Sequence, residues 1–269
     1  MHAIRLALVG VLLVSGTMHA QWLHYPTRGV PRTADGQPNF AAPAPRTPDG
    51  KPDFSGIWQL EPDAACPAVG CQVDYPAASE FRNLGAKLKG GLPYQPWAAT
   101  LVRERTDQLG KDDPVGFCKP GGAVRILTYP PYRKFIQLPD LFVILSERDV
   151  TYRQIFTDGR ALPADPDPTF NGYSTGRWDG DALVVQTNGL REGTWLDRNG
   201  SPISEAAKMT ERYRRVNYGR LEIDLTIDDP KVYTRPWTVT LAQRLVLDTE
   251  LLDYHCNDNE RSAPHMVGK

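Results

Sequence analysis

The strongest constraint on the fold is a long series of short β-type segments in the second half of the chain. They are rich in β-branched and aromatic residues and are separated by Gly, Pro, Asn and Asp. The segments are 124–129, 133–138, 141–147, 151–157, 173–178, 182–187, 208–216, 221–227, 236–247 and 250–255, and 54–58 is an earlier one. Because no helical pattern lies between them, a parallel α/β sheet is excluded, and an antiparallel barrel or sandwich is favoured.

Helical patterns are confined to two regions before this series, 79–91 and 96–110. Charge and composition exclude other classes. The 31 basic and 32 acidic residues balance, which argues against a basic nucleic-acid interface. With 41% hydrophobic and 23% charged residues, the chain has the composition of a folded globular protein.

The first twenty residues have the pattern of a signal peptide. Arg5 precedes an apolar run from Leu6 to Val14, and small residues lead to a predicted cleavage site near Ala20. No later segment is long enough to span a bilayer as a helix. We therefore predict a secreted or periplasmic protein with no membrane span.

The four cysteines fit this compartment, where thiols are readily oxidised. Cys66 and Cys71 flank a short turn-prone loop, so we predict the disulfides Cys66–Cys71 and Cys118–Cys256. The alternative, a zinc site built from thiolates, lacks both a C-x-x-C pair and a histidine at ligand spacing.

Residues 21–53 contain a repeated sequence. RTADGQPNF at 32–40 recurs as RTPDGKPDF at 46–54, and its Asp-Gly and Pro residues favour turns over a helix. We predict an extended strap over 21–53 and a single domain over 54–269. The strap lies on the domain in this interpretation, and a partner-binding arm is the alternative.

Several motifs resemble a family of exported bacterial proteins of unknown function. They are GYSTGRWDGDALVVQT at 172–187, TWLD at 194–197, TERYRR at 210–215, TIDDP at 226–230 and ELLDYHC at 250–256. The resemblance extends from about residue 30 to the end of the chain, and it implies export without implying an activity. In addition, Gly56-Ile57-Trp58 is similar to the Gly-x-Trp that opens the first strand of lipocalin-like barrels. We therefore predict an antiparallel, lipocalin-like β-barrel with an N-terminal strap and one or two short helices.

A serine hydrolase is one candidate activity, because residues 172–176 match G-x-S-x-G around Ser174, with His255 and Asp248 as possible partners. That motif requires a helix after the serine, whereas the Asp-Gly that follows here predicts a hairpin. Histidines are scarce and form no ligand cluster, so we predict neither a metal site nor a cofactor.

A barrel of about eight strands can hold one small ligand or be filled by its own side chains. We predict that it binds a small, partly apolar molecule in its cavity, and the alternative is a cofactor-independent lyase, isomerase or hydrolase in the same cavity. An envelope interaction protein that acts through the strap is a third possibility. The oligomeric state is left open. The predicted cavity residues are Arg153, Tyr173, Trp178, Trp195, Tyr213 and Trp237, and the predicted catalytic residues are Glu211 and His255.

The prediction for Glu211 follows from strand register. If residues 217–219 form a three-residue loop with Gly219 left-handed, Val216 pairs with Arg220, and Arg212 and Arg214 face acidic residues. The opposite face then carries Met209, Glu211 and Tyr213 into the apolar interior. A buried carboxylate needs a partner, so Glu211 is either functional or part of a structural ion pair with an arginine such as Arg153 or Arg177.

Overall fold

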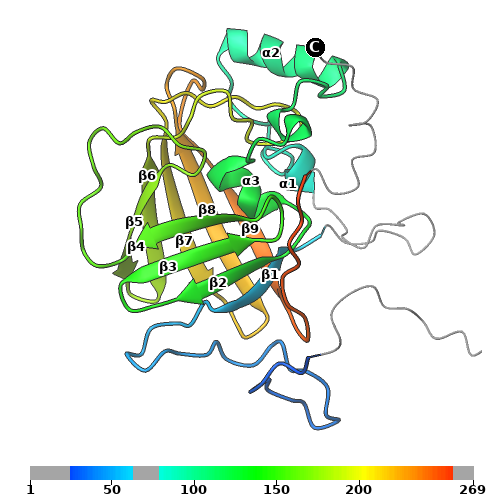
Figure 1. Cartoon of the computed structure of the whole chain (residues 1–269), viewed down its shortest axis with the longest axis vertical. Coiled ribbons are helices and arrows are strands. Elements are labelled where there is room, and N and C mark those ends of the chain that lie inside the picture. The colour runs from blue at the N-terminus through cyan, green and yellow to red at the C-terminus, as the bar shows by residue number, and fades with distance from the viewer. Residues whose placement is uncertain (1–24, 63–78, 257–269) are drawn as a thin grey trace, which may run out of the picture.

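The chain folds into a closed nine-stranded β-barrel, as a computed structural model describes for residues 25–62 and 79–256 (Figure 1). The all-β barrel predicted from the sequence is confirmed. The strands are β1 (Gly56–Leu60), β2 (Arg133–Gln137), β3 (Leu141–Ser146), β4 (Thr151–Phe156), β5 (Tyr173–Asp179), β6 (Ala182–Asn188), β7 (Lys208–Arg215), β8 (Arg220–Asp228) and β9 (Trp237–Val246).

The strands follow one another around the barrel in sequence order, and β9 pairs with β1 to close it. All neighbours are antiparallel except β4 and β5, which run parallel and share only the pairs Ile155↔Ser174 and Phe156↔Thr175. The prediction of a wholly antiparallel barrel is therefore wrong at this seam. The connection between the two strands crosses from one end of the barrel to the other, which a tight hairpin cannot do.

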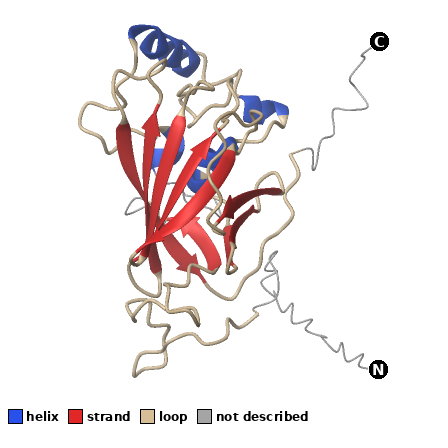
Figure 2. Ribbon diagram, turned by 90° about the vertical axis from the view of Figure 1, so that its left-hand side faces the viewer, coloured by secondary structure: helices blue, strands red, loops and turns tan. Residues whose placement is uncertain are grey.

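The helices gather at one end of the barrel (Figure 2). They are α1 (Ser79–Arg82), α2 (Pro96–Asp107), the 3-10 turn η1 (Pro114–Phe117) and α3 (Gly122–Thr128). Both helical regions were predicted, but α1 is shorter than 79–91. The predicted strand 124–129 is wrong, because it belongs to α3, whose seven residues are all buried. Such a short apolar run carries no periodicity that separates a buried helix from a buried strand.

The buried Arg133 holds α3 against the barrel. Its guanidinium donates to the carbonyl oxygens of Leu127 and Tyr129 at the C-terminal end of the helix, and to the side chain of Gln243 on β9. Burial lowers the pKa of Arg133 to about 9. Within the described chain, no carboxylate is bound to the Arg133 guanidinium. The partial negative charge at the C-terminus of α3 stabilises the cation instead.

The strap closes the opposite end of the barrel and is drawn in blue in Figure 1. Phe54, the residue that follows the strap directly, is fully buried and stacks on Trp178 with ring centroids 5.4 Å apart. Gln137 donates to the carbonyl of Pro52 and accepts from the backbone N–H of Phe54. The described part of the strap is thus held on the barrel, in line with the first of the two interpretations.

The register predicted for β7 and β8 is observed. Glu211 faces Leu225, Arg212 faces Asp224, and Arg214 faces Glu222. The expected left-handed Gly219 is wrong, since its φ is not positive. Instead, a Cβ at position 219 would lie 2.6 Å from Phe40 of the strap, so the absence of a side chain allows the close approach.

The predicted disulfide between Cys118 and Cys256 is present, with Cα atoms 5.4 Å apart. It ties the end of η1 to the C-terminal segment. That segment contacts the barrel through the bridge Arg148↔Tyr254 and the ion pair Lys134–Glu250, and it does not form the predicted strand at 250–255. The signal peptide and the predicted Cys66–Cys71 pair lie outside the described residues.

We expect Gly219→Ala to lower the free energy of unfolding by about 1–3 kcal/mol, because the new Cβ meets the Phe40 side chain. Urea or thermal unfolding measures this. Gly116→Ala is the matched control, since its Cβ would meet no atom within 4 Å. Adding Phe40→Gly, which removes the Phe40 Cβ as well as its ring, should recover much of the loss in a double-mutant cycle. A loss that is equal with and without Phe40 would show that the contact is not its cause.

Candidate functional site

The barrel interior contains a polar network centred on Arg153 and Glu211. Arg153 on β4 donates through Nη1 to Glu211 Oε1 at 2.8 Å and through Nη2 to Glu211 Oε2 at 2.5 Å. The same guanidinium reaches Ser174 on β5 and Thr187 on β6, while Tyr213 Oη donates to Glu211 Oε1 at 2.8 Å. Four strands on both sides of the parallel seam are thereby joined through the interior.

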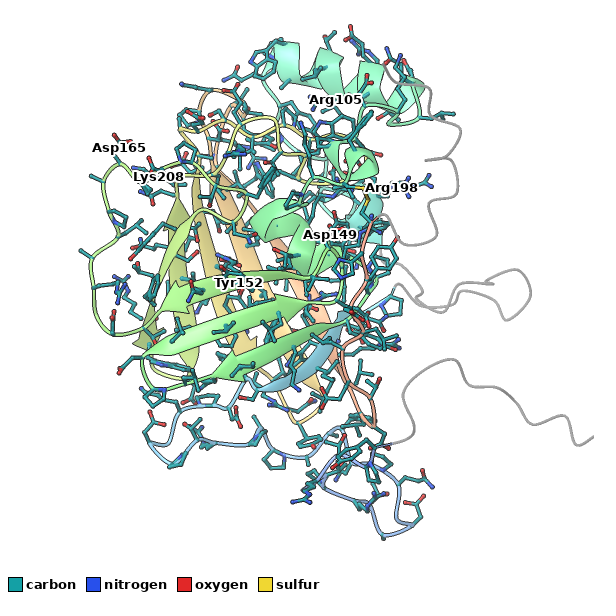
Figure 3. All side chains as sticks on the ribbon, in the orientation of Figure 1. Arg105, Asp149, Tyr152, Asp165, Arg198 and Lys208 are labelled. Carbon is teal, nitrogen blue, oxygen red and sulfur yellow. A yellow bond between two sulfur atoms is a disulfide. The ribbon has the colours of Figure 1, made fainter. Side chains whose placement is uncertain are left out.

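Strand alternation places these groups inside. Tyr152 is 61% exposed on the outer face of β4, where Figure 3 labels it, and the adjacent Arg153 is 1% exposed. Glu211 is fully buried, as its predicted register requires. The partner arginine is Arg153 rather than Arg177, which is exposed.

Electrostatics favours a charged pair with a neutral tyrosine beside it. Burial alone would lower the pKa of Arg153, but the charge and hydrogen bonds of Glu211 raise it above its ordinary value. Burial and the adjacent Glu211 raise the pKa of Tyr213 well above its ordinary value, so its hydroxyl stays a donor. With three hydrogen bonds on its two oxygens, Glu211 has the environment of a structural carboxylate.

We expect Glu211→Gln to destabilise the protein by about 3–5 kcal/mol, because it leaves the Arg153 charge buried without a counter-charge. Chemical denaturation measures the loss. Glu222→Gln is the matched control on the outer face of β8, where Glu222 pairs with Arg214 and Arg220 in partial contact with solvent, and it should cost at most about 1 kcal/mol.

Replacing both partners, as Arg153→Met with Glu211→Leu, should cost clearly less than the sum of the two single changes, since no unpaired charge remains. Additive losses would mean that the pair contributes through packing alone.

The predicted cavity residues do not converge on one site. Trp178 packs against Phe54, the residue that follows the strap. Trp195 is buried beneath Arg105 of α2, whose guanidinium lies 4.4 Å from the ring centroid; Figure 3 labels this arginine at the helical end. Trp237 is buried at the start of β9, against Tyr233. Tyr173 stacks on Phe156 beside the seam. Only Arg153 and Tyr213 of the predicted set share the network with Glu211.

The residues proposed for a hydrolase are also apart. Ser174 is 1% exposed within β5, and a two-residue hairpin, not a helix, follows that strand. His255 lies on the exposed C-terminal segment beside Cys256, whereas Glu211 is fully buried. The nucleophile-elbow geometry is therefore absent at Ser174, and the two predicted catalytic residues do not face one cavity.

Aromatic rings occupy much of the remaining interior. Phe135, Phe142 and Tyr213 pack edge to face with centroids 5.3–6.1 Å apart. Phe54 enters the same cluster from the strap, 6.1 Å from Phe142 and 6.3 Å from Tyr213. A barrel of this size can either hold a small ligand or be filled by its own side chains. This part of the interior is filled by side chains.

Open space is found instead between the strap and the barrel end. A cavity of about 430 Å³ lies there, and its lining includes Ile57, Lys134, Arg215, Tyr218, Leu245 and Thr249. Its size is in the range of small-molecule sites, and its walls combine apolar side chains with a few polar groups. A second hollow of about 520 Å³ adjoins it through residues 245–247 and reaches Phe40 and Gly219.

Arg215 forms one wall of this cavity. Its guanidinium lies over Trp58, 4.9 Å from the ring centroid, and donates to the carbonyl oxygens of Asp53, Ser55, Asn217 and Tyr218. Burial lowers the pKa of Arg215 to about 10. This cation thereby joins the strap to the β7–β8 turn and fixes the rim of the cavity.

Sequence reasoning did not identify these lining residues. What these residues share is a position at or next to the ends of β1, β2, β7 and β9. The sequence does not show that these ends form a cavity, because the cavity also depends on where the strap lies. A further missed cluster lies at the helical end, where the buried Asp197 accepts from Ser201 and from the backbone of Leu84, and Tyr94 bonds to Ser201.

In the part of the chain that the structure describes, no three His, Cys, Asp or Glu side chains are grouped to hold a metal ion. No helix there has the length and apolarity needed to cross a membrane. Comparison of the chain with protein-family models and with curated proteins finds no match.

Proposed function

We propose that this protein is an exported barrel that binds a small, partly apolar molecule in the cavity between the strap and the barrel end. The observation that carries the proposal is the cavity itself, about 430 Å³ in volume, between the described strap and the ends of the strands. The proposed site differs in place from the interior cavity predicted from the sequence, because aromatic side chains and α3 fill much of that interior.

The chemistry of the walls supports the ligand class. Ile57 and Leu245 offer apolar surface, and Tyr218 offers an aromatic ring with a polar tip. Lys134 is paired with Glu250 at 2.6 Å, whereas the cation of Arg215 is held by backbone carbonyl oxygens. A molecule with an apolar body and one polar end fits such a lining.

Export is supported by two features. The first twenty residues have the pattern of a signal peptide, and Cys118 is bonded to Cys256, as is common in oxidising compartments.

The neutral fluorescent probe N-phenyl-1-naphthylamine tests the cavity directly. We expect saturable binding to the purified protein with one site per chain, seen as an increase and a blue shift of probe fluorescence. Thr249→Trp places a large ring in the cavity lining and should weaken binding at least tenfold, about 1.4 kcal/mol.

Thr106→Trp on the exposed face of α2 is the control and should leave probe binding unchanged. Unfolding curves show whether either variant alters the fold. Absence of saturable binding, or binding that survives Thr249→Trp in full, would contradict the assignment of the cavity. Native mass spectrometry of freshly purified protein then identifies any natural molecule that co-purifies.

A further inference from the structure

A buried tyrosine with an unused hydroxyl lines the cavity under the strap. Tyr218 is 9% exposed, and its backbone N–H donates to the carbonyl oxygen of Ala42. Within the described residues, however, its hydroxyl has no hydrogen-bond partner. Leaving a polar group without a partner in a largely buried position costs free energy. An acceptor atom on a bound molecule would remove that cost.

The Tyr218 hydroxyl is available as a donor. Burial, with Asp248 nearby, raises the pKa of Tyr218 above its ordinary value, although Arg215 acts in the opposite direction. The hydroxyl is therefore protonated at neutral pH. A ligand group that accepts hydrogen bonds fits it better than one that only donates them.

The charged side chains of the same lining have partners, with one exception. Lys134 is paired with Glu250 at 2.6 Å. Arg215 donates to backbone carbonyl oxygens, and Asp53 accepts from the backbone N–H two residues after it. In the described part of the chain, the guanidinium of Arg28 forms neither a hydrogen bond nor an ion pair. The lining thus contains one cation that is available to a ligand.

The residue before Arg28 anchors it beside the cavity. Thr27 N–H donates to Asp248 Oδ1, and Asp248 N–H donates to Thr27 Oγ1, both at 2.8 Å. This reciprocal pair joins the start of the described strap to the segment that follows β9. The Asp248 carboxylate is therefore bonded to the backbone of the strap, and the Arg28 side chain keeps all its donors.

We propose that the molecule bound in this cavity is a small amphipathic carboxylate, whose apolar body lies against Ile57 and Leu245 and whose carboxylate accepts from Tyr218 and Arg28. The two donors lack acceptors in the described chain, and a carboxylate supplies two acceptor oxygens and the counter-charge for the arginine. The inference rests on the proposed binding function and narrows its ligand from partly apolar molecules to anionic ones.

Displacement of N-phenyl-1-naphthylamine by octanoate and by octanamide tests the ligand class, because the two competitors match in shape and differ in charge. At low salt, Arg28→Gln should weaken octanoate binding about fivefold or more and change octanamide binding less than twofold. Tyr218→Phe, which removes only the hydroxyl, should weaken octanoate binding about threefold or more.

Arg32→Gln is the matched control, since it removes the same charge from an exposed strap residue outside the cavity lining. It should change octanoate affinity less than twofold, and thermal unfolding shows whether each variant stays folded. Octanoate that does not displace the bound probe, or an octanoate affinity that Arg28→Gln or Tyr218→Phe leaves unchanged, would overturn the carboxylate and leave the cavity in place. Failure of the probe itself to bind would count against the proposed function, and the inference would fall with it.

Discussion

The buried ion pair between Arg153 and Glu211 holds the barrel together where its backbone pairing is weakest. β4 and β5 share two residue pairs, whereas β7 and β8 share eight. From β4, Arg153 bonds to side chains on β5, β6 and β7, so the seam is bridged through the interior instead of along the sheet. A buried ion pair is stabilising only when its remaining polar atoms are also hydrogen-bonded. The hydrogen bonds of Arg153 with Ser174 and Thr187, and of Tyr213 with Glu211, are therefore part of what stabilises the pair.

Two other buried arginines close the ends of the same barrel without a bonded carboxylate in the described chain. Arg133 binds carbonyl oxygens at the end of α3, and Arg215 binds carbonyl oxygens of the strap and of the β7–β8 turn. In the folded protein, several backbone carbonyl groups take the place of the water that would hydrate each guanidinium. Their hydrogen bonds lower the free-energy cost of burying the charge. Both ends of the barrel are covered and aromatic rings fill much of its interior, and the cavity of about 430 Å³ lies outside this core, under the strap.

Much of the barrel was predictable because local patterns determine it. Opposite charges at facing positions, Arg212 with Asp224 and Arg214 with Glu222, predicted the register of β7 and β8, and that register alone placed Glu211 inside. In the folded chain the Arg212 side chain pairs with Asp179 on β5. The parallel seam was not predictable, because it depends on where a long connection returns to the sheet. Gly219 was assigned to the wrong cause, since the atom that excludes its side chain belongs to Phe40, which is remote in sequence. The cavity was missed for the same reason, because strap and strand ends meet only in the folded chain.

The most direct test of the role of the Arg153–Glu211 pair is native-state hydrogen exchange of Glu211→Gln compared with the unaltered protein, resolved by residue. If the pair bridges the seam, amides of β4 and β5, above all Ile155, Phe156, Ser174 and Thr175, should lose more protection than those of β8 and β9. An equal loss of protection in all strands, or unchanged protection at the seam, would contradict that role.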